Sequence, residues 1–200
     1  RDRIRDAQEH PERHFPRQWM TAPDPDAVIT QCAPAMLRYP LAANGWRLSS
    51  LSCSGTALAA TWEHTDFSEY TLLPFNGELD EQQPRLAVSH TPIRESLPKA
   101  ERNIGSLLSR EEAARRLYAF TQHFSLRTRL SWRKRAVKKV EKQDVACPWI
   151  SSSWELSNLP AYLIADYRSL AQALNIPGLL IKEVTYANES WKIKGELYAK

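Results

Sequence analysis

The chain has 200 residues, 42% of them hydrophobic, with 27 basic side chains against 23 acidic ones and a formal net charge of +4. Seven Trp, seven Tyr and five Phe exclude a disordered chain, because so many large apolar rings are enough to form a core. Three cysteines cannot build a disulfide framework, and no window holds the roughly 20 apolar residues that a membrane helix needs.

The first ten residues, RDRIRDAQEH, are charged and compatible with a helix that ends before Pro11. They contain neither an initiator Met nor an apolar signal segment, so we expect a fragment or processed product whose targeting or membrane segment lies upstream of Arg1. Two interpretations fit this run: the end of a helix that leaves a membrane or coiled coil, and a frayed terminus. We assign residues 1–20 to an N-terminal connecting helix or linker.

A helix–strand–strand unit is predicted next. Asp24 and Pro25 are an N-cap and a first helical residue, and Pro34 should kink the helix or divide it in two. Strands should follow at Trp46–Cys53 and Thr56–Trp62, and two weaker candidates, Phe67–Leu73 and Arg85–Thr91, should extend the same sheet.

A middle unit begins at Ser109, which forms a capping box with Glu112. Alternating apolar and polar residues predict a half-buried strand over Leu126–Trp132. A loop through residue 148 should then lead to a second strand, with Ile150, Ser152, Trp154 and Leu156 on one face.

The last unit repeats the layout of the first, with a helix after Pro160 and strands at Leu179–Tyr186 and Ser190–Tyr198. When Gly45 is placed on Gly178, several apolar positions coincide without a gap. The coinciding pairs include Leu37 with Leu170, Leu41 with Leu174, Trp46 with Leu179, Leu48 with Ile181, Leu51 with Val184, Leu58 with Trp191 and Ala60 with Ile193. We therefore expect similar local structure in the two units.

The order of elements predicts an α+β fold made of repeated α-β-β units. The middle and last units together read α-β-β-α-β-β, which predicts two helices on one face of an antiparallel sheet, a permuted ferredoxin-like sandwich. We divide the chain into a first α+β subdomain at 21–108 and a ferredoxin-like subdomain at 109–200.

No catalytic, cofactor-binding or metal site is predicted. His10 and His14 lie in HPERH, but Pro11 stands where the zinc motif has its glutamate and breaks the helix that the motif needs. The six glycines form no phosphate-binding loop, and helix capping accounts for the pair Glu111 and Glu112. We expect no enzyme activity and no cofactor.

The cysteines predict one disulfide. Cys32 lies on the apolar stripe of the first helix, and Cys53 ends the strand that should pack beneath it, so their Cα atoms can lie within the roughly 4.4–6.8 Å of a bridge. The alternative is two buried thiols in a reducing cytosol. Cys147 has no obvious mate and should be free.

Eight basic residues and one acid, Glu141, lie between Arg127 and Lys142. Because Trp132 and Trp149 flank this run, nucleic-acid binding is one interpretation, although Trp132 falls on the apolar face of its strand. A charged hairpin loop, or a patch that faces protein or lipid, is the commoner outcome for such a run. The candidate interaction patch consists of Arg127, Arg129, Arg133, Lys134, Arg135, Lys138, Lys139 and Lys142.

Two stretches resemble the periplasmic part of PilO-type pilin accessory proteins of type IVb (thin pilus) systems. One runs from Trp19 through DAVITQCAPAMLRYPLAANGWRLSSLSCSGTALAATW, and the other is the closing IPGLLIKEVTYANESWKIKGELY. The resemblance lies in the layout and in the spaced Cys/Gly-Trp/Cys and W-x-I-x-G-x-L-Y positions, over most of residues 19–199.

The resemblance implies a full protein with a cytoplasmic N-terminal domain, one membrane helix and this domain in the periplasm, tethered to the inner membrane. It implies a non-enzymatic scaffold of the pilus assembly platform, whose sheet edges or helix faces dock other platform proteins or a second copy as a homodimer. The basic loop at 133–142 matches nothing in the family. The main alternative is a cytosolic nucleic-acid-binding module that uses the 127–142 stretch, and a weaker one is an enzyme whose site the sequence conceals.

Overall fold

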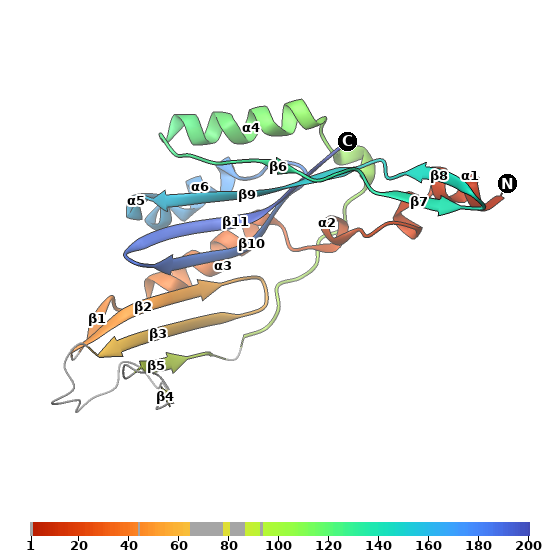
Figure 1. The fold of residues 1–200 in the computed structure, drawn as a ribbon. Coiled ribbons are helices and arrows are strands. Elements are labelled where there is room, and N and C mark those ends of the chain that lie inside the picture. Colours follow the sequence, from red (N-terminus) through yellow and green to blue (C-terminus); the bar gives the residue numbers. More distant parts are fainter. Residues whose placement is uncertain (1, 44, 65–77, 81–86, 93) are drawn as a thin grey trace.

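The computed structural model describes residues 2–43, 45–64, 78–80, 87–92 and 94–200 (Figure 1). Its helical elements are α1 (Asp2–Glu9), η1 (Pro11–Arg13), α2 (Gln18–Thr21), α3 (Pro25–Leu37), η2 (Ile104–Ser106), α4 (Arg110–His123), α5 (Ala161–Ala165) and α6 (Tyr167–Ala173). Its strands are β1 (Ala42–Ala43), β2 (Trp46–Cys53), β3 (Leu58–His64), β4 (Glu78–Asp80), β5 (Ala87–His90), β6 (Ser131–Trp132), β7 (Val137–Val140), β8 (Gln143–Ala146), β9 (Ile150–Leu159), β10 (Leu179–Ala187) and β11 (Ser190–Ala199). Among these described helices, none combines the length and the apolarity that crossing a bilayer requires.

Nine of the described strands form one antiparallel sheet, in the order β4-β5-β3-β2-β10-β11-β9-β6, with β1 beside β2. The strands β7 and β8 form a separate hairpin that projects from one end of the sheet (Figure 1). Helices α3, α5 and α6 lie behind the sheet, and α4 packs on the same core near β6 and β9. The fold is therefore a mixed α+β structure with an antiparallel sheet, as predicted.

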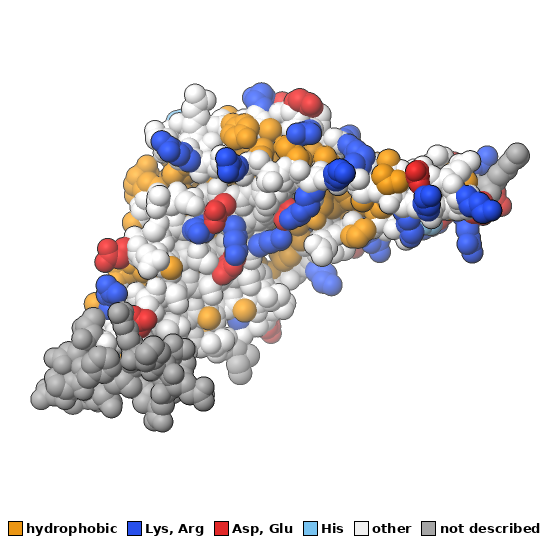
Figure 2. Space-filling view, in the orientation of Figure 1, with side chains coloured by type: hydrophobic (Ala, Val, Ile, Leu, Met, Phe, Trp, Pro, Cys, Tyr) orange, Lys and Arg blue, Asp and Glu red, His pale blue; other side chains and the backbone are white. Residues whose placement is uncertain are grey.

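Alternation along the strands explains why α3, α4, α5 and α6 pack on one face of the sheet, while at the end of the other face Trp19 of α2 packs against Leu180 and Tyr198. In β9, Trp154 and Leu156 are buried while Glu155 between them is exposed, and in β11 Ile193 is buried while Lys194 is exposed. Successive side chains of a strand point to opposite faces, so the second face of the sheet is polar. Figure 2 shows Lys, Arg, Asp and Glu side chains gathered over the middle of the face turned to the viewer.

The first and last units share their strand geometry. A glycine with positive φ precedes each hairpin, Gly45 at 83° and Gly178 at 85°. The register with the partner strand shifts around Ser49 in β2 and around Lys182 in β10, so each hairpin carries a β-bulge at the same place. The strands thus keep the offset that the sequence predicts.

The helices of the two units do not keep that offset, and here the prediction is wrong. Leu37 and Leu41 are 46% and 57% exposed, whereas their predicted equivalents Leu170 and Leu174 are buried. The reason is local: α3 is one helix, whereas α5 and α6 are separate helices that meet at Asp166.

The helix α3 also continues through Pro34 instead of dividing there. Val28, Cys32 and Met36 are buried on both sides of the proline, and their packing holds the helix together although one backbone N–H is missing. The predicted strand Phe67–Leu73 lies outside the described residues. The other weak candidate is confirmed in its described part, because β5 pairs with β3.

In the middle unit the helix start is confirmed and the first strand is shorter than predicted. The Glu112 backbone N–H donates to Ser109 Oγ at 3.2 Å, as a capping residue requires. The segment before β6 meets β9 only at an isolated bridge, Thr128 with Leu156. The Ser131 N–H donates to Ser152 Oγ at 2.7 Å, so a side chain takes the place of a backbone acceptor there.

A second hydrophobic core lies where the N-terminal segment meets the hairpin. Helix α1 packs on β7 and β8, and the Trp149 ring lies edge-on to Phe15 and Trp19 with centroids about 6 Å apart. The N-terminal residues from Asp2 onward are therefore packed, not frayed. The sheet and the main core cross the predicted boundary between 108 and 109, and the division into subdomains stays a prediction.

Candidate interaction site

The predicted disulfide between Cys32 and Cys53 is present, and it ties α3 to the end of β2 with a Cα–Cα distance of 5.6 Å. The Arg94 guanidinium caps it: Nη1 donates to the Ser54 carbonyl oxygen at 2.8 Å and lies 2.9 Å from Cys53 Sγ. Sequence reasoning missed Arg94, because it lies in a loop far along the chain with no local pattern. Cys147 is free, as predicted, and the structure buries it, which raises the pKa of its thiol.

The structure divides the predicted basic patch between two surfaces. Arg127, Arg129 and Arg133 lie beside the polar face of the sheet, whereas the rest lie on or near the projecting hairpin. Arg135 Nη1 donates to the Cys147 carbonyl oxygen at 2.7 Å, and Lys138 Nζ donates to the His14 carbonyl oxygen at 3.4 Å. Lys134, Lys139 and Lys142 are exposed. The eight residues therefore do not form one continuous basic surface.

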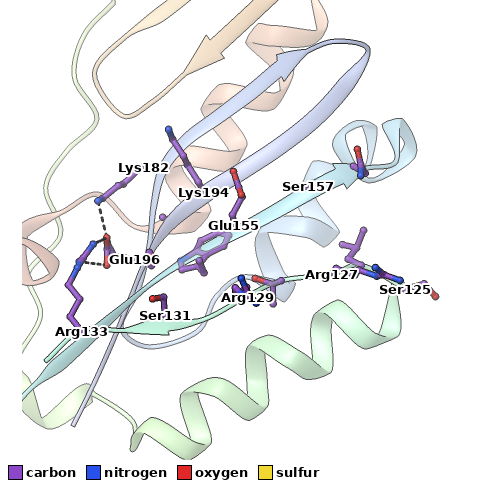
Figure 3. A pocket seen from close by; sticks show the side chains of 16 residues that line it. Ser125, Arg127, Arg129, Ser131, Arg133, Glu155, Ser157, Lys182, Lys194 and Glu196 are labelled. Atoms are coloured by element: carbon purple, nitrogen blue, oxygen red, sulfur yellow. Dashed lines mark hydrogen bonds and ion pairs between the residues drawn. The ribbon is translucent and has the colours of Figure 1, made fainter.

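The polar face holds a groove with a volume of about 900 Å³, which we call the basic groove (Figure 3). It runs between the segment before β6 and the outward side chains of β9, β11 and β10. Short serine side chains line it together with five cations and two carboxylates. These residues are Ser125, Ser131, Ser153, Ser157, Arg127, Arg129, Arg133, Lys182, Lys194, Glu155 and Glu196.

Glu196 is the buried charge of this groove, with a side chain only 4% exposed. Arg133 donates two parallel hydrogen bonds to its two oxygens, at 2.9 and 2.8 Å, and Lys182 Nζ donates a third at 3.0 Å (Figure 3). This hydrogen bonding to Glu196 raises the pKa of Arg133 further above its ordinary value. Two cationic side chains therefore hold this buried carboxylate from both of its oxygens.

Two further ion pairs neutralise charges on the same face. Lys194 Nζ lies 3.2 Å from a Glu183 oxygen, and Lys192 Nζ lies 3.0 Å from a Glu155 oxygen. Arg127 and Arg129 are exposed, and within the described part of the chain neither makes a side-chain hydrogen bond or an ion pair. The groove therefore carries an excess of positive charge that the two arginines supply at its rim.

Sequence reasoning found the three arginines of the groove but missed Lys182, Lys194, Glu155 and Glu196. A signal was available: charged residues at every second position of β11 mark its outward face. Their meeting with Arg127 and Arg129 depends on the pairing of β9 with β11, for which no local signal exists.

The histidines that the sequence analysis examined belong to small polar contacts. His14 Nε2 lies 2.7 Å from Asp6 Oδ2, and His10 Nδ1 lies 3.3 Å from Glu12 Oε1. In the described residues, no three His, Cys, Asp or Glu side chains gather in a way that could hold a metal ion.

Comparison with known proteins places the chain in a family. No curated protein and no solved structure matches it. The family model described as "Pilin accessory protein (PilO)" matches residues 1–199, almost the whole chain. The chain belongs to the pilin accessory protein (PilO) family.

Proposed function

We propose that this chain is a non-enzymatic scaffold and interaction domain of an inner-membrane type IVb pilus assembly platform, and that it faces the periplasm. Family membership over residues 1–199 carries the proposal, because it connects the chain to pilus assembly. The Cys32–Cys53 bridge supports the location, since disulfides persist in oxidising compartments such as the periplasm.

In this proposal the region 109–200 is a permuted ferredoxin-like sandwich. Its strands lie in the order β10-β11-β9-β6, the order that an α-β-β-α-β-β permutation of that fold gives, and its helices pack on one core. The sheet continues beyond β10 into β2, so the sandwich is joined to the first unit.

The surfaces that would dock other platform proteins, or a second copy, are the sheet edges and the polar face. The groove supports binding, because its described lining combines serine hydroxyls with an excess of cationic side chains that an anionic partner can contact. An upstream membrane segment would tether the domain to the inner membrane, with residues 1–20 as the connection.

The structure favours this function over nucleic-acid binding. The basic run is divided between two surfaces, and Arg133 is neutralised by Glu196. Trp149 is buried in the second core, and Trp132 is half-buried with the Arg110 guanidinium 5.0 Å above its ring. Neither ring is free to stack on bases.

Three measurements in cells test the proposal. Periplasmic reporter fusions at the C-terminus should be active, and deletion of the gene should abolish pilus assembly. Non-reducing peptide mapping of protein from cells should recover Cys32 linked to Cys53. Two free thiols, an inactive periplasmic reporter or normal pili in the deletion strain would each contradict it.

A further inference from the structure

We infer that the basic groove binds an acidic, extended segment of a partner protein, with Arg127 and Arg129 as its anchors. The existence of the groove and its positive charge follow from the structure without the proposed function. The identity of the partner, another pilus assembly protein, rests on the proposed function.

The charge of the face supports an anionic ligand. Most of its charged side chains neutralise one another in pairs, and Glu196 takes up two cations, Arg133 and Lys182. Arg127 and Arg129 have no such partner in the described part of the chain, and both line the groove. The two unpaired guanidinium groups are separated by one residue on an extended segment, and each can bind a carboxylate through two parallel hydrogen bonds.

The shape of the groove supports an extended chain. Ser153 and Ser157 of β9 line the groove with short side chains and form its floor. The labelled arginines lie along one side of β9, and Lys182 and Lys194 lie on the other (Figure 3). Serine hydroxyls both donate and accept hydrogen bonds, so the floor can bond the backbone of a peptide lying along β9. The volume of about 900 Å³ lies at the upper end of the range of roughly 300–1,000 Å³ that ligand pockets occupy.

The composition of the groove favours carboxylates of a polypeptide over the phosphates of a nucleic acid. Glu155 and Glu196 neutralise Lys192, Arg133 and Lys182, so the unpaired positive charge is confined to two arginines and does not continue along the groove as a phosphate backbone would require. A peptide can place neutral residues opposite these two glutamates. The aromatic residue in the lining, Trp154, is 2% exposed, so the described lining offers no open ring on which a base could stack.

The first test uses the 200-residue chain and a fluorescent peptide of eight residues that is rich in glutamate. Fluorescence anisotropy at low salt should show saturable binding that weakens as salt is added, because exposed charges are screened. The double variant R127E/R129E should bind at least tenfold more weakly. The matched control K139E/K142E changes the same number of charges on the projecting hairpin and should bind within twofold of the unchanged chain.

All four substituted residues are exposed, so both variants should keep the circular dichroism spectrum and melting temperature of the unchanged chain. Equal loss of binding in the two double variants would overturn the inference, because it would show attraction by net charge alone. Unchanged binding in R127E/R129E would overturn it too, as would a single-stranded oligonucleotide that displaces the peptide and binds more tightly.

The second test uses the full-length protein in cells, with a photo-crosslinking amino acid at Ser157 on the groove floor. Mass spectrometry should place the crosslink on an acidic segment of a pilus assembly protein, and R127E/R129E should abolish it. If the variant still assembles pili and forms the same crosslink, the inference fails and the proposed function stands. If reporter fusions place the domain in the cytoplasm, the proposed function fails. The anisotropy measurement in vitro would still show whether the groove binds an acidic peptide.

Discussion

The first hairpin, β2–β3, and the last, β10–β11, share one backbone design but carry different chemistry on the outer face. Both have a bulge at the same place, and the residue at the bulge is Ser49 in the first and Lys182 in the last. Both residues bond within their own hairpin, but Ser49 Oγ donates to the backbone carbonyl oxygen of Thr61, whereas Lys182 Nζ donates to the Glu196 side chain in the groove. The two hairpins therefore share the register of their strands but differ in their outward side chains.

The first and last units pair through β2 and β10 with a local two-fold symmetry. Where β2 pairs with β10, Leu51 lies opposite Tyr186 and Cys53 opposite Val184, around the central pair Ser52 and Thr185. Under the offset that relates the two units, Ser52 is equivalent to Thr185, so the pairing has a local two-fold symmetry. A self-complementary contact of this kind is what joins subunits of symmetric dimers.

In both hairpins the inward side chains form the core, whereas the outward side chains differ and determine what the polar face of the sheet can bind. Inner positions of the two hairpins are buried alike, as at Leu48 and Ile181 or Leu51 and Val184. The outer position of Glu63 in β3 corresponds to Glu196 in β11, but the first is half-buried and the second is buried between two cations.

The largest expected effect comes from Gly195→Ala in β11. The equivalent position of the first hairpin holds a large side chain, the buried Trp62. A Cβ at this position would collide with the Leu180 carbonyl oxygen and lie 3.0 Å from Trp154 Cζ2. We expect a loss of about 3 kcal/mol in the free energy of unfolding, measured by denaturant titration. The control Gly55→Ala meets Pro23 Cγ at 3.3 Å and should change stability little; similar values for the two variants would contradict this account of Gly195.

The next effect concerns the bridge, which is present in the first unit and has no counterpart in the last. The double variant C32A/C53A should lose about 3 kcal/mol of unfolding free energy, because the bridge closes a loop between residues 21 apart. Hydrogen exchange should show β2 and β3 losing protection first. A reductant should destabilise the unchanged chain and leave the variant unaffected, and a variant as stable as the oxidised chain would refute the prediction.

A smaller effect is expected from Glu196→Gln. The change weakens three charge-assisted hydrogen bonds, but Arg133 and Lys182 are each 55% exposed and regain water. We expect a loss of about 2 kcal/mol in the free energy of unfolding by denaturant titration. The equivalent change Glu63→Gln falls on a less buried side chain and should cost less; the reverse order would show that the two outer faces do not differ as described.

The smallest effect lies in the middle unit, which neither hairpin repeats. Hydrogen bonds from Arg115 and Arg116 lower the pKa of Glu112 from 4.5 to about 2. Because the folded pKa is depressed, the stabilisation of α4 by this carboxylate is complete above pH 4.5 and is lost as the pH falls through about 2. Side-chain NMR titration should place the Glu112 midpoint near 2, and a midpoint near 4.5 would show that the two arginines do not hold it in solution.

Elements with local signals could be predicted from the sequence. The capping box placed the start of α4, and the sequence pattern placed β2, β10 and β11 within one residue of their observed ends, whereas β9 continues three residues beyond the last predicted position, Leu156. The Cys32–Cys53 bridge was also within reach, since a helix and the strand that follows it must pack together. The interaction patch stays a prediction, and spacing along 127–142 does not show which of its residues share a surface, because the chain reverses at the β7–β8 hairpin.

Alternation of apolar and polar residues is enough to predict which face of the sheet most strand side chains occupy, because successive side chains of a strand point to opposite faces. Which strands are neighbours follows from the folded structure alone, since β2–β10 and β9–β11 pairing joins segments that are far apart in the chain. That pairing brings Arg133 and Lys182 onto Glu196 and leaves Arg127 and Arg129 unpaired at the rim of the groove. The sequence shows which residues are charged, but contacts between distant strands determine which of these charges are paired.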